Sequence, residues 1–474
     1  MTKSWVNSDQ GRSDPERPVG SDLHLELSGV GSRRAQLMDA LRDAIRSGRL
    51  APGTRLPPYR GLAVDLGLAR NTVASAYAEL TEEGWLSARA GSGTRVAERA
   101  TPIAPTHPRR AAPPPRRPFI YDLLPSSPDA GSFPRAAWLT SARRALAAAP
   151  NDAFGVGDPR GRPELRHALV EYLARARGVR TDAQRIVICS GFAGGLRLLA
   201  SVLPGPVAVE AYGLDVHHRV LHENGVRTVP LTVDADGARI DELTGSEATS
   251  ALLHPAHQYP TGGALHPERR AAVIDWARAR GGMVWEDDYD GEFRYDRQPI
   301  GALQGLDPDR VVYLGSTSKS LSPALRLGWM VLPAWLVDDV LAAKGGREVF
   351  TGVTDQLTLA DFLATGSYDR HLRRMRGIYR RRRDLLTTTL ARRAPHIRLS
   401  GIAAGMHAVL ELPDGTEEAT LRAARREGVA LDGLHPYRHP DSTMPPRDGL
   451  VIGYGTPPEH AFPAALDALC RALP

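Results

Sequence analysis

Lysine is scarce in this chain, and one lysine stands where it could do covalent chemistry. Lys319 ends the motif Ser316-Thr-Ser-Lys319, which follows an apolar run typical of a strand, and Arg326 lies seven residues further on. A lysine amine can form a Schiff base with an aldehyde, and a nearby guanidinium can hold the phosphate of such a cofactor. The spacing therefore indicates a site for a phosphorylated aldehyde, and pyridoxal phosphate (PLP) is the candidate.

The phosphate of PLP would need more than one contact. The hydroxyls of Ser316 and Ser318 precede the lysine and can donate to phosphate oxygens. Ser190-Gly191-Phe192 comes directly after an apolar run, and backbone amides at the start of a helix are suited to bind a phosphate group. We therefore predict that these residues form the phosphate site together with Arg326.

Three further residues match the ring of PLP. Asp287, which lies in Glu286-Asp-Asp288 at the end of another apolar run, is predicted to face the pyridine nitrogen and keep it protonated. Tyr289 could donate to the phenolic oxygen of the ring, and Tyr212 could stack on the ring face. The sequence thus offers one candidate for each role.

Each candidate also has a plainer interpretation. A lysine after a strand is usually solvated, an acidic triplet is usually a surface loop, and a tyrosine near a turn is usually packing. The acids 286–288 could instead bind Mg²⁺, but no Walker-type glycine loop would bring phosphates to them. Gly155-Val-Gly157-Asp-Pro-Arg-Gly161 has the wrong glycine spacing for a dinucleotide loop. We favour the cofactor site because its parts occur together in order, and we expect no metal site.

Strands and helices alternate in the part of the chain that carries these residues. Five apolar runs are typical of short strands, namely Ile186–Cys189, Val207–Glu210, Ala251–His254, Met283–Glu286 and Val311–Leu314. This pattern predicts an α/β domain over residues 119–474, with a mostly parallel sheet covered by helices. Ligands of such sheets bind at the carboxyl ends of the strands, where the candidate residues lie.

The preceding residues, 24–97, follow a different pattern. Apolar residues recur at helical spacing in Leu37–Ile45, and two further short helices are expected on either side of the turn Gly67–Ala69. Two helices across a three-residue turn indicate a helix-turn-helix, and a hairpin around Gly91-Ser-Gly93 would be a wing. Residues 1–23 are predicted to be a disordered tail, and the proline- and arginine-rich residues 98–118 a semi-rigid linker.

Composition sets limits on the class of protein. The net charge of +6 and the pI near 9.4 permit nucleic-acid binding without establishing it. Cys189 and Cys470 provide no disulfide framework and no metal-ligand spacing, which indicates a reducing compartment. The sequence has no apolar stretch long enough to span a membrane, so we expect a cytoplasmic protein that does not bind membranes.

Together these motifs resemble those of the MocR subfamily of GntR regulators, in which a winged helix is joined to a fold-type I aminotransferase-like domain. The winged-helix likeness rests on residues 48–57, Arg70-Asn-Thr-Val73, Ala76-Tyr77 and Gly91-Ser-Gly-Thr94. The aminotransferase likeness rests on Gly157-Asp-Pro-Arg-Gly161, His257-Gln-Tyr-Pro-Thr-Gly262, Glu286-Asp-Asp-Tyr-Asp290 and the Lys319 motif.

The resemblance implies partners as well as a cofactor. It implies a head-to-tail homodimer, in which the DNA-binding domain of one subunit lies against the aminotransferase-like domain of the other. It also implies binding to double-stranded promoter DNA, and a small-molecule effector that is either PLP or an amino acid. The DNA contacts would come from Arg60, Arg70, Asn71 and Thr72 at the major groove and backbone, and from Gly91, Ser92 and Gly93 at the minor groove.

Three features depart from the family pattern. Pro58-Tyr59 precedes Arg60 where serines are usual, and Val156 stands where a tyrosine commonly reaches the phosphate of the partner subunit. Leu450-Val-Ile-Gly-Tyr454 lacks the arginine that binds a substrate carboxylate in aminotransferases. Arg438 or Arg447 could take over that role.

We therefore expect a transcriptional regulator rather than an enzyme. The missing arginine favours the PdxR-like subgroup, in which PLP would be sensed through a Schiff base at Lys319 and pyridoxine synthesis genes would be controlled. One alternative is a PLP-dependent aminotransferase with a DNA-binding appendage. The other is a regulator of amino-acid catabolism whose effector condenses with the cofactor, which would need a carboxylate-binding group.

Overall fold

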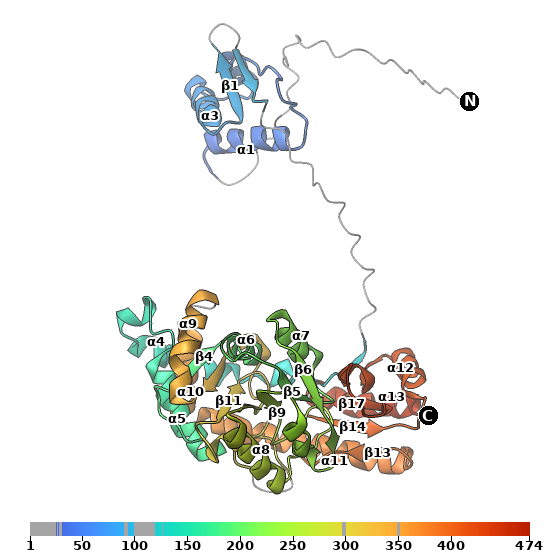
Figure 1. Cartoon of the computed structure of the whole chain (residues 1–474). Coiled ribbons are helices and arrows are strands. Elements are labelled where there is room, and N and C mark those ends of the chain that lie inside the picture. The colour runs from blue at the N-terminus through green and yellow to red at the C-terminus, as the bar shows by residue number, and fades with distance from the viewer. Residues whose placement is uncertain are drawn as a thin grey trace, which may run out of the picture. The chain divides into compact units, whose positions relative to one another are not determined.

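The computed structural model describes residues 25, 27, 31–89, 93–98, 119–125, 127–295, 300–347 and 351–474. The chain forms two compact units, Met1–Arg117 and Pro118–Pro474 (Figure 1). The predicted tail 1–23 lies outside the described residues, and so does the predicted linker 98–118 apart from Glu98. Among the described helices, none is both long and apolar enough to cross a bilayer.

The first unit is the winged helix that the sequence predicts. It consists of α1 (Arg33–Arg46), α2 (Tyr59–Asp65), α3 (Arg70–Glu82) and the antiparallel hairpin β1 (Leu86–Arg89) and β2 (Gly93–Val96). The apolar residues of α1 and α3 recur every three or four positions, so each helix buries one face against the other. This packing leaves the opposite face of α3 exposed.

A seven-stranded sheet forms the centre of the second unit. The strands run in the order β4-β12-β11-β10-β9-β5-β6, and only β12 is antiparallel to its neighbours. Their bounds are β4 (Ile186–Cys189), β5 (Val207–Glu210), β6 (Thr228–Leu231), β9 (Ser250–Leu253), β10 (Met283–Asp287), β11 (Val311–Ser316) and β12 (Gly328–Val331). The predicted mostly parallel sheet is therefore confirmed, and three of the five predicted strands shift or lengthen by one or two residues.

Helices cover both faces of this sheet because both faces are apolar. Val187, Val209 and Trp285 pack under α6 and its neighbours, whereas Ile188 and Val284 point to the other face. Figure 1 shows the same division, with α6 and α7 on one side of the sheet and α8 on the other. The helices are α4 (Arg135–Ala148), α5 (Pro163–Arg177), α6 (Phe192–Val202), α7 (Asp215–Glu223), α8 (Pro267–Arg280), α9 (Val337–Arg347), α10 (Val353–Ala364) and α11 (Ser367–Arg393).

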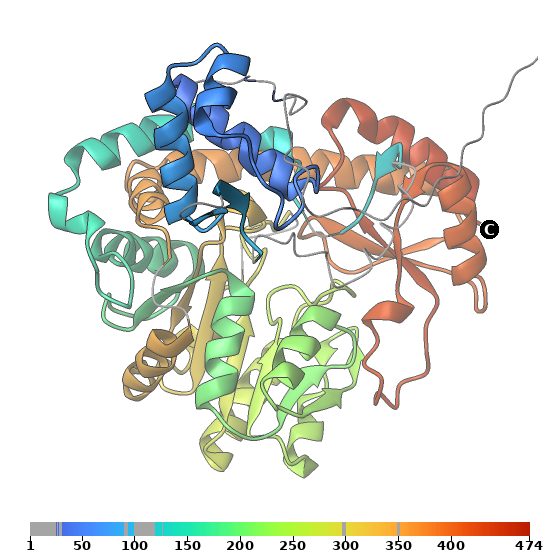
Figure 2. The same cartoon turned by 90° about the horizontal axis from the view of Figure 1, so that it is seen from above.

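A smaller C-terminal lobe packs beside the large sheet (Figure 2). Its sheet runs β13-β14-β17-β16, and α12 (Glu417–Arg426) and α13 (Phe462–Ala472) pack with it. The strands are β13 (Arg398–Ser400), β14 (His407–Glu411), β16 (Asp432–Gly433) and β17 (Gly449–Gly453), while β3 (Tyr121–Asp122) and β15 (Val429–Ala430) pair separately. The long helix α11 contributes to one hydrophobic core with residues of both lobes.

A buried ion pair ties α5 to the carboxyl end of β10. Arg177 Nε lies 2.6 Å from Asp288 Oδ2, and their side chains are 0% and 1% exposed. Tyr313 Oη donates to the same carboxylate oxygen at 2.7 Å. Because every polar group of this cluster is out of water, removal of one partner would leave an unpaired buried charge.

We expect Arg177→Met to lower the free energy of unfolding by about 3–5 kcal/mol, because Asp288 would lose its cation. Urea unfolding followed by tryptophan fluorescence would measure this loss. The matched control is Arg219→Met, which breaks the exposed pair with Asp215 and should cost about 1 kcal/mol or less. Equal midpoints for the two variants would contradict the expected role of the buried pair.

Candidate functional site

The carboxyl ends of five strands bring predicted cofactor residues and further polar residues to one edge of the sheet. Ser190 follows β4, His254 follows β9, Asp287 ends β10, and Lys319 comes shortly after β11. Glu210 ends β5 at the same edge. These residues are far apart in the sequence, so the parallel register of the strands is what gathers them.

A buried histidine lies between two carboxylates at the centre of this edge. His254 Nδ1 is 2.5 Å from Glu210 Oε2, and His254 Nε2 is 3.1 Å from Asp287 Oδ2. Burial by itself would lower the pKa of His254, but Glu210 and Asp287 outweigh it and raise the pKa to about 10. His254 is therefore a cation at neutral pH, and it holds Asp287 in place as a carboxylate.

Lys319 is half-buried, and the charges of two carboxylates act on its amine. Burial lowers the pKa of its amine, and the negative charges of Asp290 and Asp287 partly offset that effect. A lysine with a lowered pKa holds more of its amine uncharged at neutral pH, which is the form that attacks an aldehyde. The environment of Lys319 thus suits the predicted Schiff base.

The hydroxyl of Tyr289 and the carboxylate of Asp290 both lie within hydrogen-bonding distance of the same ring nitrogen of His257. His257 Nδ1 is 2.9 Å from Asp290 Oδ2 and 3.1 Å from Tyr289 Oη. Asp290 can only accept as a carboxylate, so the proton belongs on Nδ1, which donates to it. The hydroxyl proton of Tyr289 then remains available for another acceptor, and burial raises the pKa of Tyr289 well above its usual value. Tyr289 is therefore a neutral donor, as its predicted role requires.

The predicted phosphate residues lie together at the start of α6. Among the described residues, Arg326 is the one non-glycine residue with a positive φ, 51°. Its Nη2 donates to the carbonyl of Ser190 at 2.8 Å. Gly191 has a φ of 78°, and a Cβ added to it would lie 3.7 Å from Arg326 Nη1. A strained backbone of this kind is common at ligand sites.

An open cavity of about 390 Å³ adjoins this cradle, and Ser190, Gly194 and Arg326 line part of it. Phe192 begins α6, so its amide is one of the unpaired N–H groups at that helix start. On the other side, the N–H of Ser318 donates to Ser316 Oγ at 3.4 Å. The guanidinium, the amides and the hydroxyls form a donor set that fits a phosphate dianion, and Asp287 with Lys319 fits the ring of PLP.

Tyr212 lies in an aromatic and apolar cluster at the border of the C-terminal lobe. Its ring is fully buried with Tyr259, Tyr437 and Val451, and its hydroxyl has no hydrogen-bond partner among the described residues. Stacking of Tyr212 on a cofactor ring stays a prediction. His217 is a second ring near the site, because it lies nearly parallel to His254, with 6.1 Å between ring centroids.

Both of the substitute arginines have partners within the C-terminal lobe. Arg438 donates to the carbonyl of Met444 through Nε at 3.1 Å and through Nη2 at 2.6 Å. Arg447 pairs with Glu411 at 3.3 Å. Residues 450–453 form most of β17, and Val451 among them packs with tyrosines. Among the described residues, Val451 of this motif therefore has apolar and aromatic surroundings.

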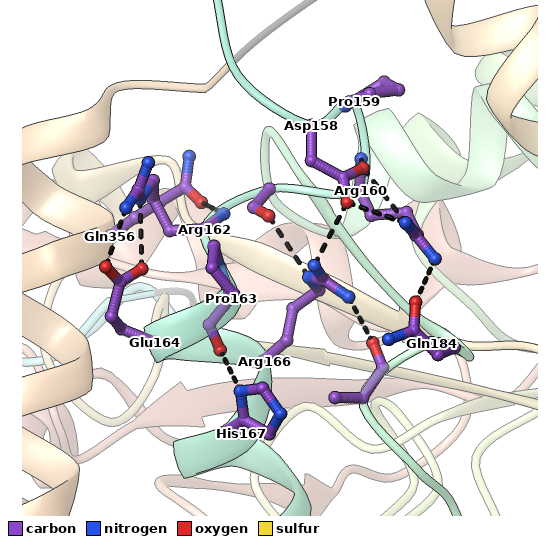
Figure 3. A network of polar contacts seen from close by, with 12 residues as sticks. Asp158, Pro159, Arg160, Arg162, Pro163, Glu164, Arg166, His167, Gln184 and Gln356 are labelled. Carbon is purple, nitrogen blue, oxygen red and sulfur yellow. Dashed lines mark hydrogen bonds and ion pairs between the residues drawn. The ribbon is translucent and has the colours of Figure 1, made fainter. Parts of the chain in front are cut away.

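The loop that carries Val156 is held by a polar network (Figure 3). Asp158 accepts from the backbone N–H of Arg160 at 2.8 Å and pairs with the guanidinium of Arg166 at 3.1 Å. The network belongs to the motif 157–161, so this motif stabilises the loop. Val156 and Phe154 are left 91% and 57% exposed.

The predicted DNA-contacting residues lie on the outside of the winged helix. Arg70 and Asn71 begin α3 and are exposed, Thr72 is half-buried, and Arg60 on α2 is exposed. Gly93 begins β2 and is exposed, whereas Gly91 and Ser92 lie outside the described residues. The exposed residues are not needed for the core, which uses Val73, Ala76, Tyr77 and Leu80 of α3.

Sequence reasoning gave no role to several residues of the site, namely Glu210, His217, His254, His257, Asp290 and His407. Two of them carried a usable signal, because Glu210 and His254 end predicted strands in polar side chains. Polar residues at the carboxyl ends of buried parallel strands gather at one edge. His407 carried no such signal, since it comes from the C-terminal lobe.

Comparison with known families supports the division of the chain into a winged helix and an aminotransferase-like domain. Residues 33–96 match bacterial regulatory proteins of the gntR family, and residues 127–443 match aminotransferase class I and II. The probable rhizopine catabolism regulatory protein MocR of Rhizobium meliloti is 32% identical, over 88% of this chain and 89% of that protein. The pyridoxine biosynthesis transcriptional regulator PdxR of Corynebacterium glutamicum is 30% identical, over 92% and 95%.

A solved structure resembles the second unit in fold. The crystal structure of an archaeal alanine:glyoxylate aminotransferase aligns with a TM-score of 0.68 at 23% identity, covering 75% of this chain and 90% of that one. This likeness confirms the fold predicted from the strand pattern.

The charge on His254 predicts a pH dependence of stability. Its folded-state pKa of about 10 exceeds the unfolded value of about 6.5, so its contribution is full below pH 6.5 or so and is lost as the pH rises to about 10. We expect the free energy of unfolding of the protein without added PLP to fall by about 3–5 kcal/mol across this window. His254→Gln should lack that part of the decline.

Chemical denaturation at closely spaced pH values would measure the decline. The control is His167→Gln, an exposed histidine on α5, which should keep the wild-type decline. A decline of the same size in His254→Gln would show that other groups cause it.

Proposed function

We propose that this chain, which belongs to the MocR subfamily of GntR-type transcriptional regulators, senses PLP through a Schiff base at Lys319 and controls genes of vitamin B6 synthesis. The chain is a DNA-binding regulator with an aminotransferase-like domain, and that domain has the fold of PLP-dependent enzymes. The observation that carries the proposal is the position of Lys319 shortly after β11, at the sheet edge where Asp287 and the Arg326 cradle also lie.

In the proposed site, each candidate cofactor residue has one role. Lys319 would hold the aldehyde carbon, and Asp287, fixed by His254, would keep the pyridine nitrogen protonated. Tyr289 would donate to the phenolic oxygen, and Tyr212 would lie against the ring. The phosphate would be bound by Ser190, Gly191, Phe192, Ser316, Ser318 and Arg326. When bound, PLP supplies an electron-withdrawing ring and a visible chromophore.

The absent carboxylate clamp supports sensing rather than amino-group transfer. An amino acid held at Lys319 would need a cation for its carboxylate, because an unpaired carboxylate in a buried pocket is costly. Val451 and its tyrosine neighbours offer none, and both candidate arginines are engaged elsewhere. The relative named as a pyridoxine biosynthesis regulator is consistent with PLP itself as the signal.

The proposed regulator acts as a head-to-tail homodimer. The exposed Val156 and Phe154 support this assembly, since apolar side chains on a loop held by ion pairs gain by being covered. In the dimer, the winged helix of one subunit would lie against the aminotransferase-like domain of the other. PLP would then bias how the two winged helices are presented to DNA.

Replacement of Lys319 tests the sensing role. Lys319→Arg keeps the positive charge but cannot form the Schiff base, and Lys319→Ala removes both. We expect both variants to lose the visible absorbance band that wild type shows with PLP, and to lose the effect of PLP in footprints on the region upstream of the chain's own gene. An unchanged PLP effect on DNA in both variants would overturn the proposal.

A second assay separates the regulator from an aminotransferase. Wild-type protein mixed with PLP, an amino donor and a keto acid should give no sustained turnover. Sustained turnover would support the aminotransferase with a DNA-binding appendage. Changes in the absorbance band on titration with amino acids would instead support an amino-acid effector.

Arg70 tests the DNA surface separately. Arg70→Ala removes an exposed guanidinium at the start of α3, so we expect it to weaken operator binding by about 1–3 kcal/mol without changing the PLP absorbance band. Fluorescence anisotropy with the footprinted fragment would measure the affinity. Arg46→Ala removes the same charge at the end of α1 and should weaken binding less. If the two variants bind DNA equally well, α3 is not the recognition helix.

A further inference from the structure

Ser320, which directly follows Lys319, is held by two side chains of α11. Tyr368 Oη donates to Ser320 Oγ at 2.7 Å, and His371 Nε2 lies 2.8 Å from the carbonyl oxygen of Ser320. All three of these residues are buried. Tyr368 and His371 are three positions apart and therefore project from the same face of the helix. One turn of α11 thus holds both the side chain and the backbone of Ser320.

The ring of His371 is fixed in one orientation. The Ser320 carbonyl can only accept, so Nε2 carries the ring proton and donates to it. Nδ1 accepts from Arg374 Nη2 at 3.3 Å, and the same guanidinium nitrogen donates to the carbonyl of Ser132 at 2.9 Å. Burial, together with the positive charge of Arg374, lowers the pKa of His371 to about 4, so the ring is neutral at physiological pH. Both ring nitrogens are used, and a flip of the ring would break both bonds.

The opposite end of the turn that carries Lys319 is fixed as well. The N–H of Thr317 donates to the carbonyl of Leu327 at 3.0 Å, and the N–H of Leu321 donates to the carbonyl of Thr317 at 2.9 Å. Leu327 directly follows Arg326, the cationic residue of the phosphate cradle. Lys319 therefore lies in a closed turn that is bonded next to the cradle at one end and to α11 at the other.

The helix α11 is a firm anchor for this turn because it is part of a packed core. Tyr368 and Leu372 of α11 belong to the same hydrophobic cluster as Leu321 and Leu327 of the turn region. The ring of Tyr368 also meets Tyr172 edge to face, with 5.1 Å between ring centroids and 85° between ring planes. Protein cores are close-packed, so a shift of the turn against α11 would disturb many contacts at once.

The position of the turn matters because the side chain of lysine is long. An amine on a flexible four-carbon stem can reach many positions, whereas attack on an aldehyde needs the nitrogen within about 3–3.5 Å of the carbon and correctly directed. In the condensation, Lys319 Nζ forms the C=N bond and gives up two protons, which leave with the carbonyl oxygen as one water. A fixed backbone beside Lys319 restricts where the stem begins, and so restricts where the amine can lie.

We propose that Tyr368 and His371 are positioning residues for Lys319, because they fix Ser320 against α11 and thereby present the amine to the aldehyde of PLP. This inference rests on the proposed sensing through Lys319. Neither residue is among those assigned to the ring or the phosphate of PLP. Both act through Ser320, so they set how fast Lys319 condenses and not how well the phosphate is bound.

Two variants of His371 separate its hydrogen bond from its packing. His371→Leu leaves the Ser320 carbonyl without its donor, whereas His371→Gln can place an amide N–H near the position of Nε2. After rapid mixing with PLP, we expect the rate at which the visible absorbance band appears to fall by about 10–100-fold in His371→Leu. In His371→Gln the rate should stay within about threefold of wild type, because a donor is kept.

Pyridoxamine phosphate provides the readout that a general disruption of the site would change. It has the ring and the phosphate of PLP but an amine in place of the aldehyde, so it cannot condense with Lys319. Isothermal titration should give an affinity for pyridoxamine phosphate within about threefold of wild type in both His371 variants, because the phosphate donors are kept.

Tyr368→Phe tests the second contact by removal of a single oxygen. We expect it to slow condensation by about fivefold, the rate equivalent of one hydrogen bond. The matched control is Tyr379→Phe, on the same helix and in the same core. The Tyr379 hydroxyl has no hydrogen-bond partner among the described residues, so this variant should keep the wild-type rate. This pair decides the question if His371→Leu does not fold.

A wild-type rate in His371→Leu or in Tyr368→Phe would overturn the role of that residue. A His371→Gln variant as slow as His371→Leu would overturn the hydrogen bond as the cause. A loss of affinity for pyridoxamine phosphate as large as the loss of rate would overturn the inference as a whole. The proposed function would fail separately, if wild-type protein gave no absorbance band with PLP or if Lys319→Arg kept that band.

Discussion

The structure depends on how five acidic positions at the carboxyl edge of one sheet are satisfied out of water. Glu210, Glu286, Asp287, Asp288 and Asp290 are each 5% exposed or less, and each has a polar or charged partner. Glu286 accepts backbone N–H groups of Leu303 and Gln304 at 2.7 and 2.9 Å, and Asp288 takes Arg177. Glu210 and Asp287 share His254, and Asp290 takes His257. Because a buried carboxylate without a partner is costly, each pairing constrains the loop that supplies the partner.

Because of these pairings, some of the neighbouring acids stabilise the fold while another remains able to contact a ligand. Asp288 and Glu286 are fully engaged with groups that stabilise the fold, so they cannot also serve a ligand. Asp287 is held on one side by an imidazolium, which leaves the other side of the carboxylate for a protonated ring nitrogen. Asp290 and Asp287 together moderate the lowering of the Lys319 pKa that burial causes. An acidic triplet that could have been a magnesium site is thereby accounted for residue by residue.

The same edge connects the large lobe with the C-terminal lobe. Segment 401–407 meets the loops of His257 and Asp290 through backbone bonds, and β17 packs Val451 among tyrosines. In the winged helix, folding uses one face of α3 and leaves Arg70 and Asn71 exposed. The winged helix and the aminotransferase-like domain thus offer separate surfaces, one for DNA and one for a candidate cofactor.

The sequence by itself indicated the types of the elements and the candidate cofactor residues. Periodicity revealed the winged helix and the strands, and the order of Ser190, Asp287 and Lys319 along the chain indicated the site, because polar residues after buried parallel strands must meet at one edge. Only the tertiary structure decided the partners: His254 between Glu210 and Asp287, His257 beside Asp290, and His407 from the other lobe. These contacts join residues far apart in the chain, and the charge of each group depends on burial and on the neighbour it meets, which no local pattern contains.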